Sequence, residues 1–83
     1  MTNEQIDKFL SSNIKANPLI RITFKTRNSI IGVFIQTPDF NELKSKNFWR
    51  IVSESNFEQW KISKDYNLCR MFNGAAFFKL AIA

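Results

Sequence analysis

Residues 18–35 read PLIRITFKTRNSIIGVFI, and this stretch decides the fold. From Ile20 to Phe24 every second residue is apolar, which is the period of a strand that buries one face. After a polar turn at residues 26–29, Ile30 to Ile35 are apolar on both faces, as in a central strand of a sheet. Gly32 inside this second strand indicates a bend or a close approach of another backbone. Two neighbouring strands are therefore predicted, the first half-exposed and the second buried.

A helix is predicted before these strands, over residues 1–17. Its apolar residues recur at helical spacing and form one stripe, which consists of Ile6, Phe9, Leu10 and Ile14. Thr2 or Asn3 can cap the first turn, and Gln5 stands at capping-box spacing from Thr2. The helix should end at Ala16-Asn17-Pro18, because proline disfavours helical geometry in the residue before it.

After the second strand the sequence predicts a short helical turn and more strands. Thr37-Pro38 is typical of a helix start, so the turn is expected to reach Leu43. The further strands are expected at Phe48–Ser53, Phe57–Ser63, Leu68–Phe72 and Ala75–Ile82. Asn73-Gly74, between the last two, is the strongest short hairpin signal in the chain.

The order of these elements predicts the fold class. One helix followed by short strands at regular spacing is typical of an α+β protein. We expect an N-terminal helix followed by a strongly bent five- to six-stranded antiparallel sheet or a small SH3-like barrel. All 83 residues should form a single small domain, with the helix in residues 1–17 and the barrel-like part in residues 18–83.

The composition excludes most catalytic machinery. The chain has no histidine, one cysteine and two glycines, so it lacks the usual base near neutral pH, cysteine-rich metal sites and glycine-rich phosphate loops. Glu54 and Glu58 are a near pair of carboxylates, but they flank a predicted turn, where exposed carboxylates are ordinary. We therefore expect a protein that is not an enzyme and holds neither a metal nor a small-molecule cofactor.

No segment predicts contact with a membrane. The first residues lack the basic-then-apolar pattern of a signal peptide, and no apolar run approaches the roughly 20 residues that span a bilayer. The single cysteine, Cys69, cannot form an internal disulfide, and its place among strand residues predicts a buried structural thiol. A cytoplasmic location is expected.

The positive charge lies in the predicted strands and their loops. Twelve Lys and Arg against seven Asp and Glu give a net charge of +5, and residues 1–17 are neutral overall. Several cations on one face would bind phosphates or another polyanion. The alternative is that each cation is simply solvated or protects a sheet edge from aggregation. The candidate phosphate contacts are Arg21, Lys25, Arg27, Lys44, Lys46 and Arg50.

Aromatic side chains between these cations are candidates for base stacking. Phe40 lies near the predicted helical turn, and Phe48-Trp49 places adjacent rings on opposite faces of a strand. An exposed ring beside basic residues can stack on an unpaired base. The alternative is that Phe40 and Trp49 pack under the N-terminal helix or into a subunit interface.

Three features together resemble the Sm-like family, which includes bacterial members. They are the N-terminal amphipathic helix, the strand Ile30-Ile31-Gly32-Val33-Phe34, and Phe72-Asn73-Gly74-Ala75-Ala76-Phe77, whose glycines match the family's two glycine positions. The resemblance implies a bent five-stranded barrel whose protomers pair edge to edge into rings and stack RNA bases between loop side chains. Asp39-Phe40-Asn41 is similar to the family's first RNA-binding loop, which adds Asn41 to the candidate residues. The family spaces this acidic residue and asparagine more widely.

Two functions follow as hypotheses. The first is a non-enzymatic module that binds single-stranded nucleic acid, RNA in particular, with the six cations on phosphates and Phe40 or Trp49 stacked on a base. The second is a module for protein interaction or self-assembly that uses strand edges and aromatic surface. The apolar segment Ala75 to Ala83 favours the second, because such a strand can pair with a neighbour's edge. The expected partners are RNA or another polyanion, or a second copy of the chain.

Overall fold

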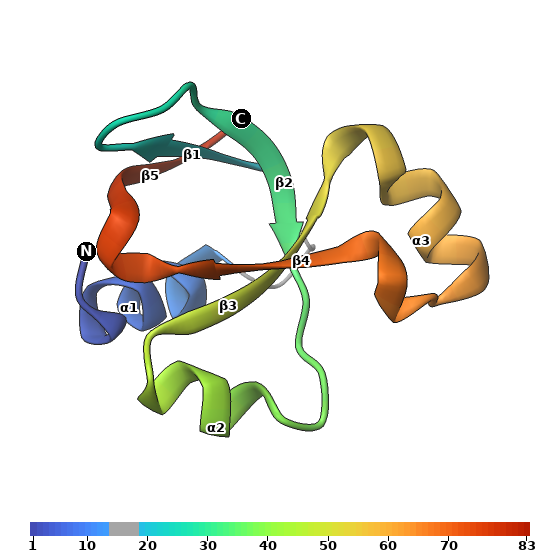
Figure 1. Ribbon diagram of the computed structural model, residues 1–83, viewed down its shortest axis with the longest axis horizontal. Coiled ribbons are helices and arrows are strands. Elements are labelled where there is room, and N and C mark those ends of the chain that lie inside the picture. Colours follow the sequence, from blue (N-terminus) through green and yellow to red (C-terminus); the bar gives the residue numbers. More distant parts are fainter. Residues whose placement is uncertain (14–18) are drawn as a thin grey trace.

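The computed structural model describes residues 1–13 and 19–83. Its helices and strands, in chain order, are α1 (Asn3–Asn13), β1 (Ile20–Phe24), β2 (Ile30–Phe34), α2 (Phe40–Ser45), β3 (Phe48–Ser53), α3 (Phe57–Ser63), β4 (Cys69–Asn73) and β5 (Phe77–Ile82). The strands form one antiparallel sheet of five, in the order β4-β3-β2-β1-β5 (Figure 1). The predicted α+β class is confirmed.

The sheet is strongly bent but does not close into a barrel. β4 and β5 are its two edges. The rings of Phe24 on β1 and Phe72 on β4 nevertheless lie 5.6 Å apart between centroids, although β2 and β3 separate these strands in the sheet. This contact shows that the sheet curls strongly. As a result, β4 faces β1 across the concave side of the sheet (Figure 1).

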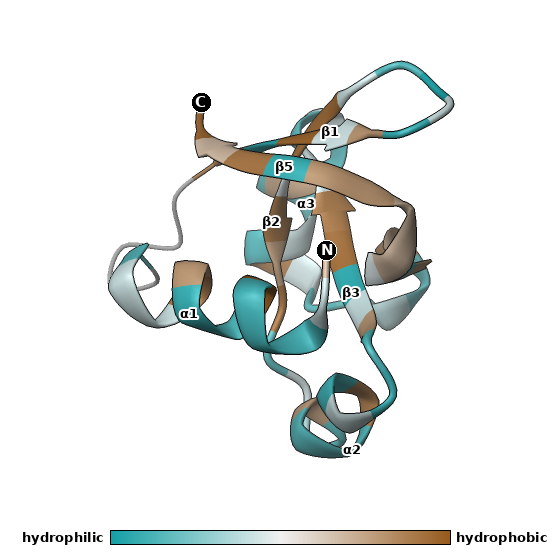
Figure 2. Cartoon of the chain, turned by 90° about the vertical axis from the view of Figure 1, so that its left-hand side faces the viewer, coloured by the Kyte–Doolittle hydropathy of each residue, from teal (hydrophilic) through white to brown (hydrophobic). Residues whose placement is uncertain are grey.

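The concave face of the sheet holds the larger hydrophobic core. Its fully buried side chains come from the strands and from α1, and include Ile6, Leu10, Ile22, Trp49, Ile51 and Phe77. A smaller cluster on the opposite, convex face consists of Val33, Ile35, Val52 and Trp60. Figure 2 shows that the strands are mainly hydrophobic, whereas α1 and α2 are mainly hydrophilic.

The beginning of α1 is capped as its sequence predicts. The backbone N–H of Gln5 donates to Thr2 Oγ1 at 3.2 Å, and the N–H of Thr2 donates to Gln5 Oε1 at 2.9 Å. This reciprocal pair is a capping box, which satisfies two donors that the first turn would leave free. Ile14 and the predicted helix end at Ala16-Asn17-Pro18 lie outside the described residues.

Gly32 in β2 is needed for space. A Cβ on this residue would lie 2.7 Å from the carbonyl oxygen of Val52 on β3, a distance that side chains do not tolerate. The predicted close approach of another backbone is confirmed. It lets β2 and β3 stay paired where the sheet bends.

The strand predicted at Phe57–Ser63 is wrong, because these residues form α3. Phe57 and Trp60 are three positions apart and both pack toward the sheet, which is helical spacing. Ile62, which the strand prediction placed beside Trp60, is 87% exposed. The aromatic and aliphatic residues of this segment suit the period of a strand as well as that of a helix. Packing against Val33 and Val52 selects the helix.

The hairpin predicted at Asn73-Gly74 is also wrong. Residues Gly74–Ala76 form a 3-10 turn that carries the chain from one edge of the sheet to the other, so β4 and β5 are not paired. No glycine has a positive φ, whereas a two-residue Asn-Gly hairpin turn requires one. The Asn73 side chain instead accepts a hydrogen bond from the N–H of Ala75 at 2.9 Å.

In the part of the chain that the structure describes, no helix has the length and apolar character needed to cross a membrane.

Candidate functional site

The three candidate cations of β1 and its following turn point in different directions. Arg21 is exposed on the convex face, opposite Ile31 and Ala81 in the neighbouring strands. Lys25 is exposed beside the N-terminus. The pKa of the Met1 amine is lowered mainly by burial of the amine and, to a smaller extent, by the charge of Lys25. Arg27 reaches the rim of the concave face. These three cations therefore do not lie on one face, a point that the sequence left open.

The three candidate cations in and after α2 and on β3 each lie close to a carboxylate. Lys44 Nζ lies 3.5 Å from Asp7, Lys46 Nζ lies 3.7 Å from Glu42, and Arg50 Nη2 lies 2.8 Å from Asp39. Asp39 also accepts a hydrogen bond from the Thr37 hydroxyl. This bond and the one from Arg50 hold the pKa of Asp39 below its usual value. Each of these cations therefore has a carboxylate partner within the fold.

The stacking role expected of Trp49 is wrong. Trp49 is 1% exposed, in the core under α1, and its Nε1–H donates to Asn47 Oδ1 at 2.8 Å. Phe40 is half-buried and packs edge-on against Trp49 at 5.8 Å between ring centroids. The alternative interpretation, packing under the N-terminal helix, holds for Trp49, whereas Phe40 is only partly packed against the same core. Asn41 is exposed on α2 and lines a shallow pocket with Phe40 and Lys44.

Arg27 is the candidate cation that lies over aromatic rings together with a second arginine. Its guanidinium lies 4.9 Å from the ring centroid of Phe24 and 6.0 Å from that of Phe72. The guanidinium of Arg70, on β4, lies 5.7 Å from the same Phe72 ring. Phe72 is half-buried and both arginines are exposed. We call these three residues the Arg27–Phe72–Arg70 cluster.

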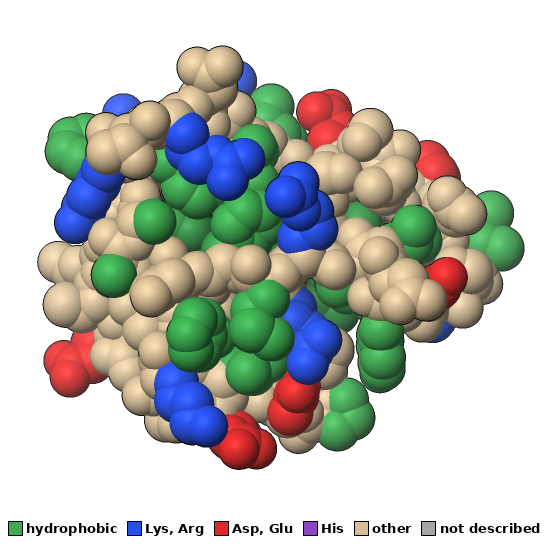
Figure 3. All heavy atoms as spheres, in the orientation of Figure 1, with side chains coloured by type: hydrophobic (Ala, Val, Ile, Leu, Met, Phe, Trp, Pro, Cys, Tyr) green, Lys and Arg blue, Asp and Glu red, His purple; other side chains and the backbone are tan. Residues whose placement is uncertain are grey.

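The bend of the sheet builds this cluster. Arg27 belongs to the turn after β1, and Arg70 and Phe72 lie on the concave side of β4, which the bend carries over β1. Figure 3 shows Lys and Arg side chains on either side of hydrophobic side chains in the region above β4. Two guanidiniums therefore lie within about 6 Å of the centroid of one half-buried aromatic ring.

The two arginines of the cluster differ from Lys44, Lys46 and Arg50 in their surroundings. Among residues 1–13 and 19–83, no carboxylate lies within 4.0 Å of either guanidinium. Their neighbours are aromatic rings, which attract the cations weakly and leave their hydrogen-bond donors free. The cluster thus differs from the ion-paired cations of α2 and β3.

Comparisons of the chain with protein-family models, with curated proteins and with solved structures found no match.

Sequence reasoning missed Arg70 and Phe72. The two residues are two positions apart in the predicted strand Leu68–Phe72, so they lie on the same face of that strand. This spacing was the one sign in the sequence that they belong together. Their meeting with Arg27 depends on the curl of the sheet, which no local pattern reports.

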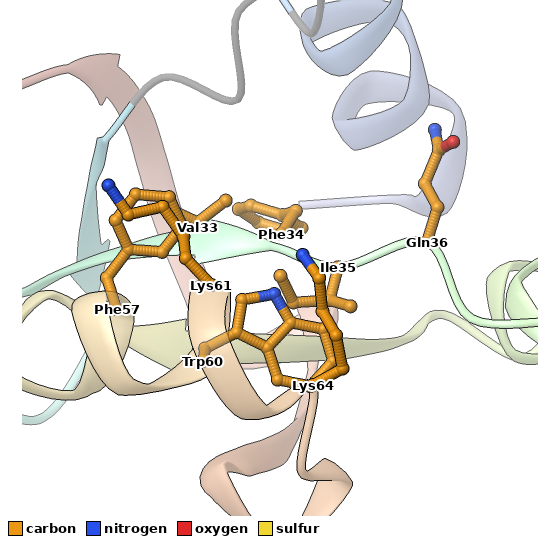
Figure 4. Close-up of a pocket in the computed structure, with 8 residues that line it drawn as sticks. All are labelled: Val33, Phe34, Ile35, Gln36, Phe57, Trp60, Lys61 and Lys64. Carbon is orange, nitrogen blue, oxygen red and sulfur yellow. The ribbon is translucent and has the colours of Figure 1, made fainter.

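A second place where cations lie over aromatic rings is on the convex face. Here α3 and the end of β2 border a half-open pocket of about 570 Å³. Figure 4 shows its lining, with the rings of Phe57 and Trp60 on α3 turned toward β2 and the lysine side chains of α3 extending beside them. We call this the α3 pocket.

The described residues offer little for metal or thiol chemistry. Within them, no group of three or more His, Cys, Asp or Glu lies together. Burial raises the pKa of the half-buried Cys69 thiol, which lowers the thiolate fraction near neutral pH.

Proposed function

We propose that the protein is a non-enzymatic module that binds single-stranded nucleic acid, RNA in particular, through the Arg27–Phe72–Arg70 cluster. The observation that carries the proposal is the convergence of two unpaired guanidiniums on one accessible ring. Phosphates attract both cations, and aromatic rings and guanidinium planes are surfaces on which unpaired bases stack. Base stacking on an aromatic ring is worth about 1–3 kcal/mol per base.

The geometry of the cluster favours an unpaired strand over a duplex. Bases in a duplex are stacked on one another, so their faces are closed to Phe72. The arginines already lie over the rings of Phe24 and Phe72, which reduces the side-chain order that binding must impose. The resemblance to the Sm-like family is part of the proposal, since members of that family stack RNA bases on side chains.

Fluorescence anisotropy with a short, labelled, mixed-sequence RNA tests the proposal. We expect binding at low salt that is stronger for the single strand than for its duplex. The double variant Arg27→Gln, Arg70→Gln should weaken binding by about tenfold or more, because two charge-assisted contacts are lost. The matched control, Arg21→Gln with Lys79→Gln, removes the same charge from the convex face and should change affinity much less. No binding by the unaltered protein, or equal losses in both variants, would contradict the proposal.

Self-assembly is a second candidate function, favoured by the edge strand β5. Phe78 is 65% exposed and Ile82 is 51% exposed on this strand, and both edges of the sheet have free backbone hydrogen-bonding groups. Pairing of β5 with the β4 edge of another copy would cover these side chains. Sedimentation should then find an oligomer that Phe78→Lys dissociates. A monomer at high protein concentration would exclude this function and leave the nucleic-acid proposal standing.

A further inference from the structure

The α3 pocket has an apolar floor. Val33 at 2%, Ile35 at 9% and Trp60 at 6% exposure form it together with the ring of Phe57. These side chains come from β2 and α3, on the convex face, whereas the Arg27–Phe72–Arg70 cluster lies on the concave side. The two sites are therefore separate, and the volume of about 570 Å³ is typical of sites for small molecules rather than for polymers.

The rim of the pocket is cationic. Lys61 Nζ lies 5.2 Å from the ring centroid of Phe57, and Lys64 Nζ lies 5.5 Å from that of Trp60. Figure 4 shows both ammonium groups beside the ring surfaces that line the cavity. None of the described residues that line the pocket is acidic. A ligand with an apolar body and one negative end matches this combination of floor and rim.

The two lysines are not equivalent. Lys61 is paired with Glu58 at 3.0 Å, one turn earlier on the exposed side of α3. For Lys64, the described part of the chain offers no carboxylate within 4.0 Å. Lys64 is thus the cation whose charge is free to meet a ligand.

The backbone of Lys64 supports this assignment. Its φ is 53°, in the left-handed region, and its N–H donates to the carbonyl of Trp60 at 2.9 Å to end α3. Glycine would end the helix in the same way without the conformational cost that a side chain brings. The lysine side chain therefore adds nothing to the backbone geometry, and what it adds is an ammonium group over Trp60.

We infer that the α3 pocket binds a small amphiphilic carboxylate, a molecule of the medium-chain fatty-acid class, with its apolar chain against Val33, Ile35 and Trp60 and its carboxylate at Lys64. Both lysines line the pocket with their ammonium groups over the rings, so their aliphatic stems offer a chain further apolar contact. The inference does not depend on nucleic-acid binding.

The two tryptophans provide the readout. In an NMR titration with octanoate, we expect the indole N–H signal of Trp60 to shift in a saturable manner. The indole N–H of Trp49 is buried and bonded to Asn47, so its signal should stay in place as an internal control. Octanol should bind at least several-fold more weakly than octanoate, and acetate should not shift Trp60. Equal affinity for octanol, or shifts of both indoles together, would overturn the inference.

A matched pair of variants tests the role of Lys64. Lys64→Gln should weaken octanoate binding by about tenfold, because a charge-assisted contact becomes a neutral one. Lys8→Gln removes the same charge from an exposed position on α1 and should leave the affinity unchanged. The variant Arg27→Gln, Arg70→Gln should keep octanoate binding, which separates this result from the nucleic-acid proposal. Unchanged octanoate affinity in Lys64→Gln would overturn the assignment of the carboxylate to Lys64.

Discussion

The Arg27–Phe72–Arg70 cluster and the α3 pocket combine the same two ingredients in different ways. Each places two cations within about 6 Å of aromatic ring centroids. The cluster uses planar guanidiniums around an accessible ring on the surface, whereas the pocket uses ammonium groups at the rim of a cavity. Guanidiniums stack and bind phosphate through several donors, while an ammonium is a point charge. The type of cation and the depth of the site therefore favour a different class of ligand at the cluster than at the pocket.

The two sites also differ in how the chain builds them. The pocket depends on residues of α3 that are three or four positions apart, set against one strand. The cluster depends on β4 coming over β1, which the turn Gly74–Ala76 permits by leading the chain away from β4 toward the opposite edge. A change in that turn should therefore disturb the cluster and the core together.

The largest expected effect is that of Gly74→Ala. A Cβ at this position would lie 2.8 Å from Trp49 Nε1 and would also collide with Asn47 and Ile6. Overpacking of this kind should lower the free energy of unfolding by about 1–3 kcal/mol, measured by urea denaturation. Ala75→Ser, at the exposed next position, serves as the control and should stay within about 0.5 kcal/mol of the unaltered protein. An unchanged midpoint for Gly74→Ala would show that the turn is not tightly packed.

Exchange of arginine for lysine in the cluster asks whether charge alone is sufficient there. The variant Arg27→Lys, Arg70→Lys keeps both charges but loses the planar groups. We expect RNA affinity to fall by about fivefold, the equivalent of about 1 kcal/mol of lost stacking, with little change in its salt dependence. Full affinity in this variant would mean that the cluster acts through charge alone, as the lysines of the α3 pocket are proposed to do.

Lys64→Gly changes the pocket in the opposite sense. Relief of the left-handed backbone should raise the free energy of unfolding by about 0.5–1 kcal/mol, seen as a higher thermal midpoint. The same variant should lose octanoate binding and retain RNA binding. A decrease in stability would indicate that the Lys64 side chain supports the fold through its contact with Trp60.

Asp39 provides a pH test of the ion-paired region near α2. The pKa of its carboxyl is held below the unfolded value of about 3.8 by the Thr37 hydroxyl and by Arg50. The stabilisation is therefore complete above this value and is lost as the pH falls through the lower, folded-state pKa. In Asp39→Asn this pH-dependent contribution is absent, so stability should fall less steeply as the pH is lowered. Acid unfolding followed by circular dichroism measures this. Identical acid transitions would show that the Asp39 contacts do not contribute.

The sequence predicted the elements whose pattern is local and unambiguous. α1, β1, β2 and β3 lie within a few residues of their expected ranges, because period and flanking turns agree at each of them. α3 was missed because Phe57, Trp60 and Ile62 suit a strand as well as a helix until their packing partners are known. The Asn73-Gly74 turn was misread because the steric demand at Gly74 comes from Ile6 and Trp49, which are distant in sequence.

Much less of the candidate site was predictable. Arg27 was identified by its charge, but the carboxylates that pair with Lys44 and Arg50 come into reach through tertiary structure. Trp49 satisfies the pattern of an exposed ring beside basic residues and is nevertheless in the core, since α1 covers that face of β3. The cluster itself requires the bend of the whole sheet.

The salt dependence of RNA binding tests the central claim most directly. Anisotropy titrations across a range of salt would compare Arg27→Gln, Arg70→Gln with Lys61→Gln, Lys64→Gln, two variants that lose equal charge at the two sites. Each lost phosphate contact should reduce the slope of log affinity against log salt by about 0.7. We predict a slope reduced by about 1.4 and a loss of affinity of about tenfold or more for the arginine variant alone. Equal slopes and equal affinities in the two variants would contradict the assignment of the nucleic-acid site to the Arg27–Phe72–Arg70 cluster.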